Sequence, residues 1–169
     1  PIDGNGTDLY AVRDLLLGED DSIRFSTAKL ATEGMNYLYN LADITVLPSS
    51  NEGWGLSLTE SMMAGTMIIA NVTGGMQDQM RFVDDKGKWY TNSKELPSNH
   101  YGTFTEHGEW VLPVYPKALG MVGSMVTPYI WDSRCDYRDA YENIKTLHSM
   151  SDKKRKKIVG PQNWKHPYK

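Results

Sequence analysis

Two carboxylates and two glycines lie close together in the middle of the sequence. Glu52 and Glu60 are eight positions apart, and Gly53 and Gly55 flank Trp54 between them. Glycine lets a backbone approach a ligand closely and leaves its amide N–H groups accessible. A helix predicted to follow adds the unpaired N–H donors and partial positive charge of its N-terminus. These residue types at this spacing favour a binding site for a phosphate-containing anion.

The carboxylates restrict what that anion can be. Glu52 and Glu60 would repel a lone phosphate, because all three groups are negatively charged. They can bind a ligand that extends beyond its phosphates at both ends and presents hydroxyl groups there. A nucleoside diphosphate sugar has a ribose on one side and a hexose on the other. The residues therefore point to a nucleotide-sugar site.

Simpler interpretations of the same residues stay open. Ser57 and Glu60 fit a capping box, in which the glutamate returns to the backbone N–H of the serine. Glu52 alone fits a solvated loop acid. Trp54 can stack on a ligand or pack its own loop. The combination of all of them in one loop is what favours a ligand site.

Short apolar strands alternate with helices around this loop. Such alternation predicts an α/β fold, a Rossmann-like open parallel sheet flanked by helices on both faces. The predicted strands are 23–27, 44–47, 66–72 and an edge strand at 109–114. The predicted helices are 8–17, one that begins at Thr32, 58–64, 136–150 and a last one capped by Ser151. The helix from Thr32 should bury a stripe of Met35, Leu38, Tyr39 and Ala42, and the helix 136–150 should carry Tyr137, Tyr141, Ile144 and Leu147 or His148 on one face.

Ligands of open parallel sheets bind beyond the carboxyl ends of the strands. That rule selects the loops 27–32, 49–56 and 73–77. Residues 76–108 have few periodic apolar positions, so we expect an irregular excursion with one short hairpin around Gly87 to Tyr90.

Composition sets the broad class. The chain has 169 residues, 40% of them hydrophobic and 23% charged, with a net charge of −3, which predicts one globular domain without a preference for polyanions. No apolar stretch approaches the ~20 residues of a membrane span. The single cysteine, Cys135, favours a reducing compartment and hence the cytoplasm.

The four histidines have no metal-ligand spacing, so we expect no metal. We interpret Lys153 to Lys157 as a solvated helix face rather than a nucleic-acid site.

The segment 52–70 resembles the signature of the large retaining glycosyltransferase family called group one, or family four. The signature has a Glu, seven residues, a second Glu, a small-residue helix end with Gly, and a strand. Residues 38–49 and the pair Gly74-Gly75 also resemble it. The resemblance is dense from about Ile23 to Gly75 and weaker after that.

The resemblance implies a GT-B fold of two Rossmann-like lobes, of which this chain would be the second, donor-binding lobe. It implies hexosyl transfer from a nucleoside diphosphate sugar to an acceptor, with retention and without a bound metal or other cofactor. Glu52 would contact the donor sugar as the catalytic carboxylate. Binding roles fall on the amides of Gly53, Trp54, Gly55, Leu56 and Ser57, on Glu60 at the ribose, and on Thr27 to Lys29 at the base.

Some family features lie outside this sequence. The basic residues that clamp the diphosphate belong to the first strand–helix unit of this lobe, and we expect this chain to begin after that strand. We expect the acceptor-binding lobe to be missing from it altogether. We therefore expect residues 1–169 to be a single lobe and a fragment, inactive without an acceptor lobe from the same or another chain. The family also has an acid shortly after the glycine pair, where Asp78 stands here.

Two other functions are compatible with the sequence. The same lobe could be a nucleotide-sugar-binding module without transferase activity, or the chain could be another doubly wound enzyme such as an epimerase. Asp3 to Gly6 does not match the dinucleotide fingerprint of redox enzymes, since no strand precedes it and the third glycine is missing.

Overall fold

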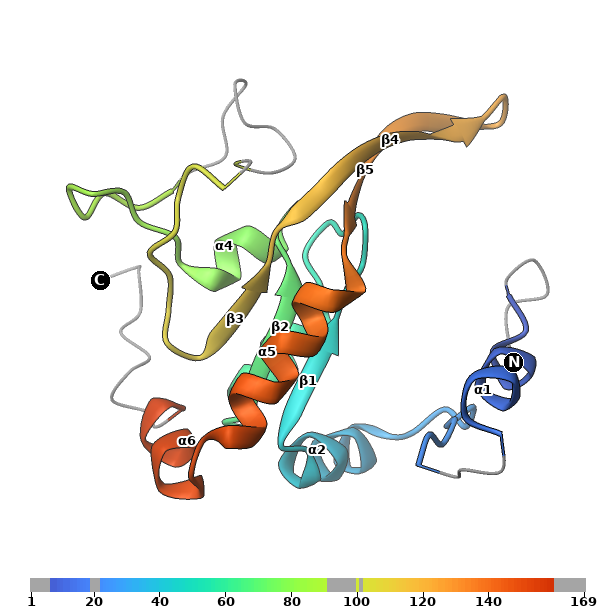
Figure 1. The fold of residues 1–169 in the computed structure, drawn as a ribbon, viewed down its shortest axis with the longest axis horizontal. Helices are drawn as coiled ribbons and strands as arrows, with labels where there is room; N and C mark the ends of the chain where they lie inside the picture. The colour runs from blue at the N-terminus through green and yellow to red at the C-terminus, as the bar shows by residue number, and fades with distance from the viewer. Residues whose placement is uncertain (1–6, 19–21, 91–99, 101, 160–169) are drawn as a thin grey trace. The chain divides into compact units, whose positions relative to one another are not determined.

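The computed structural model describes residues 7–18, 22–90, 100 and 102–159. The chain divides into two compact units, residues 1–35 and 36–169. Figure 1 shows the helices and strands along the chain. The larger unit contains the sheet and the Glu52 loop, and each unit has its own internal contacts.

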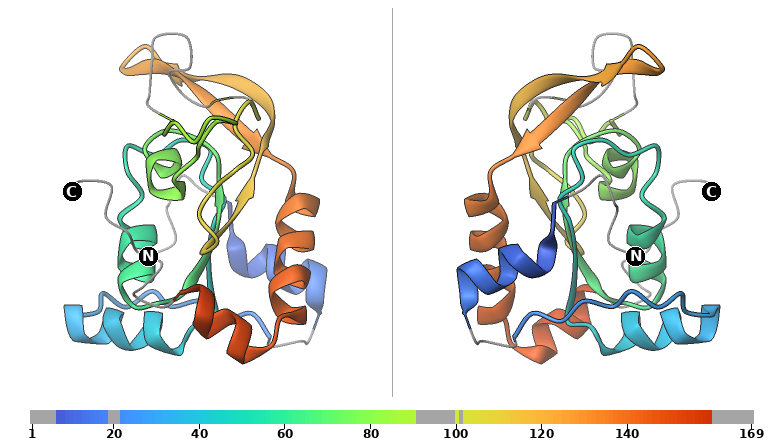
Figure 2. Two further views of the ribbon diagram at one scale, coloured as in Figure 1. Left: turned by 90° about the vertical axis from the view of Figure 1, so that its left-hand side faces the viewer. Right: turned by 90° about the vertical axis from the view of Figure 1, so that its right-hand side faces the viewer.

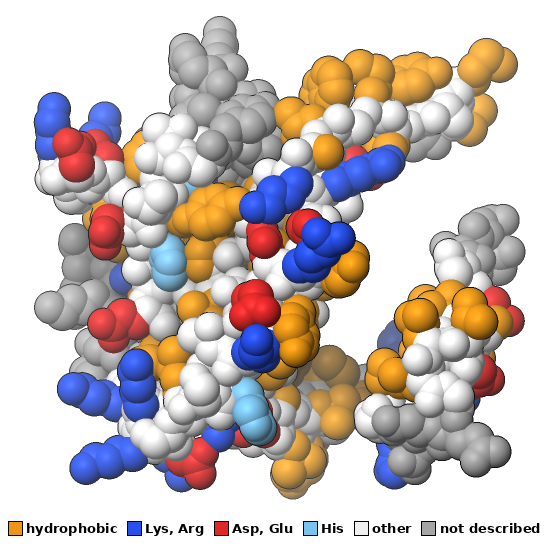
Figure 3. All heavy atoms as spheres, in the orientation of Figure 1, with side chains coloured by type: hydrophobic (Ala, Val, Ile, Leu, Met, Phe, Trp, Pro, Cys, Tyr) orange, Lys and Arg blue, Asp and Glu red, His pale blue; other side chains and the backbone are white. Residues whose placement is uncertain are grey.

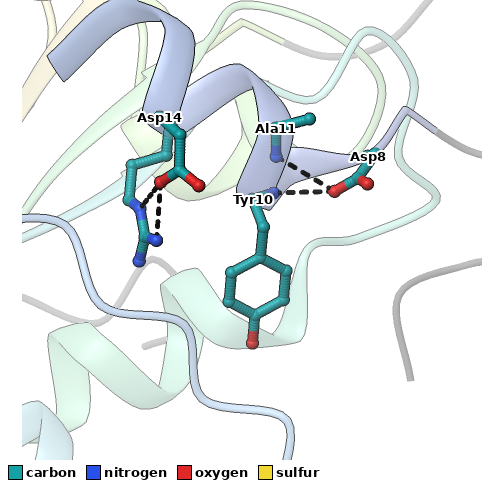
Figure 4. A network of polar contacts seen from close by, with 5 residues as sticks. Asp8, Tyr10, Ala11 and Asp14 are labelled. Atoms are coloured by element: carbon teal, nitrogen blue, oxygen red, sulfur yellow. Dashed lines mark hydrogen bonds and ion pairs between the residues drawn. The ribbon is translucent and has the colours of Figure 1, made fainter. Parts of the chain in front are cut away.

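The smaller unit contains helix α1, Leu9–Leu17. The Asp8 side chain caps it by accepting hydrogen bonds from the backbone N–H groups of Tyr10 and Ala11, at 3.0 and 3.1 Å (Figure 4). Gly18, at φ 63°, ends the helix. This confirms the helix predicted over residues 8–17.

The strand predicted at residues 23–27 is wrong. The segment has no regular secondary structure, and Ile23 is 45% exposed. A strand needs a neighbour to receive its backbone hydrogen bonds, and the described part of the smaller unit contains no strand. Phe25 instead packs edge-on against Tyr10, with ring centroids 4.7 Å apart.

The larger unit is built on a parallel sheet of order β1-β2-β3 (Figure 1). Its strands are β1 (Ile44–Leu47), β2 (Met67–Asn71) and β3 (Val111–Val114). Ile44 pairs with Met67, and Ile68 pairs with Val111. Every residue of β2 is buried, as expected for a central parallel strand. The predicted strands 44–47, 66–72 and 109–114 are confirmed.

Helices cover both faces of this sheet. Helix α3 (Leu56–Met63) contacts β1 and β2, and α5 (Tyr137–Ser149) contacts β2 and β3. Figure 2 shows α3 and α5 on opposite sides of the sheet. Leu58 and Leu147 are buried from these two helices. The fold class predicted from the sequence, a Rossmann-like α/β sandwich, is confirmed.

Two more helices belong to the fold. Helix α2 (Thr32–Leu41) precedes β1, and α6 (Asp152–Ile158) follows α5. Ser151 caps α6 by accepting from the Lys154 N–H, as predicted. Its basic residues face solvent except Arg155, which forms an ion pair with Asp43 at 3.3 Å.

The faces predicted for α2 and α5 need correction. No residue of α2 is buried, so its apolar stripe does not form a buried face.

On α5, Tyr137 and Tyr141 are 76% and 56% exposed. Leu147, from the predicted face, is buried as expected, and Asn143 joins it where α5 meets the sheet. The Asn143 amide donates to the carbonyl oxygens of Leu112 and Pro113, so a polar residue occupies a contact that hydrophobic periodicity assigns to apolar ones.

The excursion after β2 begins with a short helix that the sequence did not predict, α4 (Met76–Met80). Val83 then pairs antiparallel with Trp89 and with Glu106. The Asp84 carboxylate accepts from the backbone N–H groups of Lys86 and Lys88 inside the turn. The Val83–Trp89 pairing corresponds to the hairpin predicted around residues 87–90.

The structure contains a second sheet that the sequence did not predict. Strands β4 (Pro116–Ser124) and β5 (Thr127–Cys135) form a two-stranded antiparallel ribbon. The ribbon leaves the parallel sheet after β3 and returns directly to α5 (Figure 1). We call these residues, 116–135, the β4–β5 ribbon.

Candidate functional site

The loops that follow β1 and β2 are packed backbone to backbone. The two strands are parallel, so both loops leave the same edge of the sheet. The Gly75 N–H donates to the Glu52 carbonyl oxygen at 3.2 Å. A Cβ added to Gly74 would lie 2.0 Å from the Glu52 carbonyl oxygen, and one added to Gly75 would lie 2.1 Å from that of Gly53. Only glycine fits at these two positions, and their contact fixes the backbone of the Glu52 loop.

Helix α3 begins directly after this loop without a side-chain cap. Its N-cap is Gly55, in the left-handed conformation at φ 79° and ψ 65°. The capping-box interpretation of Ser57 and Glu60 is therefore wrong, because Ser57 lies inside the helix. Gly55 provides no side-chain cap. The Leu58 N–H donates to the Gly55 carbonyl oxygen, so the N–H groups that precede Leu58 are the ones without an intrahelical acceptor. The partial positive charge of the helix N-terminus acts at the same point.

The Glu60 side chain is held by a tyrosine from another helix. The Tyr39 hydroxyl of α2 donates to Glu60 Oε2 at 2.9 Å. Burial, together with the hydrogen bond to Glu60 and its negative charge, raises the pKa of Tyr39 to about 12. Tyr39 therefore remains a protonated donor at neutral pH and fixes the orientation of the Glu60 carboxylate. Glu60 itself is exposed to solvent.

Trp54 belongs to a closed ring of hydrogen bonds. Its indole Nε1–H donates to Thr59 Oγ1 at 2.9 Å, and the Thr59 hydroxyl donates to Gln79 Oε1 at 2.7 Å. The Gln79 side-chain amide returns to the Trp54 carbonyl oxygen. The indole thus packs and fixes its own loop. It is still 43% exposed, so part of the ring surface is open to a ligand.

The structure brings most of the predicted site residues together. Glu52 is half-buried in the loop, Gly53 is exposed, and Leu56 and Ser57 begin α3. Glu60 lies farther along the same helix. Thr27 and Lys29 are different, because they lie in the smaller unit, in an exposed segment without regular secondary structure. Their predicted contact with a base stays a prediction.

Sequence reasoning missed the residues that support the loop. Tyr39 was assigned to an apolar stripe, and neither Thr59 nor Gln79 was singled out. No local pattern marks these residues in the sequence, and only the structure shows that Gln79, in the short helix after the glycine pair, is 7% exposed. Asp78 lies in the same helix, and partial burial of its carboxyl group raises its pKa. Burial raises the pKa of Tyr90, and the negative charge of Asp78 raises it further.

The β4–β5 ribbon is attached to the start of the same loop. The Ser133 N–H donates to the Ser50 carbonyl oxygen at 2.8 Å, and the Asn51 amide donates to the Trp131 carbonyl oxygen at 3.0 Å. Asn71, at the end of β2, donates to the carbonyl oxygens of Ser49 and Ser133. The base of the ribbon therefore forms part of the structure that positions Glu52.

No group of three or more His, Cys, Asp or Glu side chains in the described ranges could hold a metal ion. Within the same ranges no helix is both long and apolar enough to cross a bilayer.

An open parallel sheet with a glycine-fixed loop leading into an uncapped helix defines a Rossmann-like lobe of the kind that binds nucleotides. The family described as "Glycosyl transferases group 1" matches residues 4–90. The chain belongs to this family of GT-B glycosyltransferases.

Three bacterial proteins similar to this chain are named D-inositol 3-phosphate glycosyltransferase. The protein from Thermomonospora curvata is 44% identical over 43 residues, 25% of this chain and 10% of that protein. Those from Salinispora arenicola and Geodermatophilus obscurus are each 35% identical, over 65 and 82 residues. These matches cover 38% and 46% of this chain and 14% and 18% of the relatives. The chain thus spans less than a fifth of the length of these relatives.

Proposed function

We propose that this chain is the donor-binding lobe of a retaining, metal-independent glycosyltransferase that uses a nucleoside diphosphate sugar. The observation that supports this most is the Glu52–Gly55 loop, fixed by Gly74 and Gly75 and continuing into the uncapped N-terminus of α3. The family assignment favours glycosyl transfer over the epimerase alternative. An acceptor-binding lobe and a cytoplasmic location are part of the same proposal.

The diphosphate would lie at the start of α3. Backbone N–H groups from Gly53 to Leu56 and the partial positive charge of the helix would offset its negative charge. Such donors are already oriented before the sugar–phosphate bond breaks, so they stabilise charge that develops on the leaving diphosphate. This is how the lobe would support transfer without a metal ion.

The two carboxylates would bind the two ends of the donor. Glu60 would accept hydrogen bonds from the ribose hydroxyls, with the Tyr39 hydroxyl holding the carboxylate in place at 2.9 Å. Glu52, whose backbone is fixed by Gly75, would contact the hydroxyls of the transferred sugar. Hydrogen bonds to a charged group contribute about 1.5–3 kcal/mol each, which is enough to discriminate a hydroxylated ligand.

Ligand titration tests this division of roles. Binding of UDP, GDP, ADP and their hexose conjugates is measured by calorimetry on the chain and on Glu60→Gln, Glu52→Gln and Glu142→Gln. We expect Glu60→Gln to weaken the bare nucleotide about tenfold, which corresponds to about 1.4 kcal/mol. Glu52→Gln should weaken only the sugar conjugate. Glu142, exposed on α5, is the control and should change nothing.

Equal weakening of the bare nucleotide by the Glu52 and Glu60 substitutions would contradict the assigned roles. Failure of every nucleotide and conjugate to bind the folded chain would contradict the proposal that it binds the donor.

A further inference from the structure

The outer part of the β4–β5 ribbon exposes apolar side chains at an unusual density. Met125 and Val126, in the turn at its tip, are 100% and 94% exposed. Behind them, Met121, Tyr129 and Trp131 are 59%, 65% and 50% exposed. Figure 3 shows hydrophobic side chains along the ribbon and at its tip. Contiguous exposed apolar surface of this kind marks an interaction site.

Both faces of the ribbon are apolar. Residues opposite each other in an antiparallel pair point to the same face, and neighbours along a strand point to opposite faces. Met121 pairs with Trp131, and Val122 pairs with Ile130. One face therefore carries Met121 and Trp131, and the other carries Val122 and Ile130. The outer ribbon is apolar all round.

The charged residues of the ribbon are confined to its base. From Leu119 to Trp131 the sequence has no charged residue, and Lys117, Asp132 and Arg134 follow on the two strands. Lys117 forms an ion pair with Asp139 at 2.9 Å, so the base has no strong net charge. The ribbon is thus divided along its length into an apolar tip, two aromatic residues and a charged base.

This division matches the polarity profile of a bilayer surface. Tyr and Trp have amphipathic rings that lie at the headgroup level. The strand rise of about 3.3 Å per residue puts the turn roughly 13 Å beyond Trp131. With Trp131 among the headgroups, Met125 and Val126 would reach the boundary with the acyl chains, the depth at which interfacial segments bind. The ribbon backbone farther down would remain among polar groups.

A second copy of the chain fits the ribbon less well. A stable protein interface uses 20–30 residues from each partner, and the uncharged segment supplies roughly half of that. A flat protein partner would also cover only one of the two apolar faces. Lipid surrounds an inserted tip on all sides.

We infer that the tip of the β4–β5 ribbon inserts into the outer layer of a lipid bilayer and attaches this lobe to a membrane surface. Insertion depends on Met125 and Val126, with Tyr129 and Trp131 among the headgroups. Because the charges at the base are nearly balanced, binding does not require anionic lipid and changes little with salt.

Vesicle flotation tests the inference. The chain is incubated with phosphatidylcholine vesicles at 0.1 and 0.5 M NaCl, and the bound fraction is compared with that of M125D/V126D. We expect the unmodified chain to float at both salt concentrations and the double variant to bind at least tenfold more weakly. Both residues are almost fully exposed, so their replacement should leave the fold intact, which circular dichroism checks.

The matched control is L15D/L16D, which places the same charges on adjacent exposed leucines of α1, 85% and 74% exposed. This control should bind vesicles like the unmodified chain. The inference is overturned if the unmodified chain does not float, or if both double variants lose binding equally. Binding only to anionic vesicles, lost at 0.5 M NaCl, would also overturn it. Self-association in sedimentation without vesicles, abolished by M125D/V126D, would show that a second copy covers the tip.

Discussion

The parallel sheet and the β4–β5 ribbon are both made of apolar strands, yet one forms the core and the other faces solvent. All of β2 is buried between helices, whereas no described side chain of β4 is buried. Ser133, near the end of β5, is buried where the ribbon meets the sheet. The difference shows that apolar sequence alone does not decide burial. A strand becomes part of the core only where helices cover both of its faces.

The largest expected effect comes from matched isoleucines in the two regions. Ile69 in β2 is 1% exposed and Ile130 in β5 is 44% exposed. Ile69→Ala should lower the free energy of unfolding by about 2–5 kcal/mol, because it leaves a cavity in the core. Ile130→Ala should lower it by less than about 1 kcal/mol. Urea denaturation measures both, and equal losses would show that the ribbon is packed as tightly as the sheet.

The second-largest expected loss of stability comes from adding a side chain at the glycine contact at the edge of the sheet. Gly75→Ala would place a methyl group 2.1 Å from the Gly53 carbonyl oxygen, so the two loops must separate. We expect a loss of about 2–3 kcal/mol in the free energy of unfolding. Gly53→Ala is the control, because a Cβ there meets nothing within 4 Å. If both variants unfold at the same urea concentration, the two loops do not need their close contact.

A smaller effect depends on pH and concerns a buried histidine beside the sheet. His100 is 0% exposed; it packs edge-on against Phe82 and accepts a hydrogen bond from the Phe104 N–H. Burial lowers its pKa from 6.5 to about 4. Below pH 6.5 the unfolded chain binds a proton that the folded chain excludes, so stability falls as pH decreases from about 6.5 to 4.

Between pH 7 and 5.5 this should remove about 1 kcal/mol of stability. His100→Asn keeps an acceptor in place of the imidazole nitrogen and cannot be protonated in this range. Its denaturation midpoint should therefore depend less on pH than that of the unmodified chain. An unchanged pH dependence would assign the acid sensitivity to other groups.

The sequence predicted the regions that local pattern controls. Strand 44–47 and the helix after Asp8 were found because β-branched runs and caps act over a few residues. The glycine-flanked loop and its place at the end of β1 were found for the same reason. The parallel sheet follows from alternation of such elements along the chain.

What the sequence did not predict depends on distant contacts. Tyr39 and Glu60 are separated by 21 positions, and Gln79 and Trp54 by 25, so no local pattern links them. The β4–β5 ribbon was missed because Gly120, Gly123 and Pro128 interrupt it, and two apolar faces remove the alternation that marks a strand. The strand predicted at 23–27 failed because sheet formation needs a neighbouring strand, which sequence pattern alone does not provide.

The hydrogen bonds that join Ser133 and Trp131 to Ser50 and Asn51 have a thermodynamic consequence. They couple the orientation of the ribbon to the conformation of the loop that carries Glu52. If attachment of the ribbon favours one conformation of that loop, it changes the affinity of the loop for its ligand by some factor. The ligand must then change the affinity of the ribbon for its partner by the same factor.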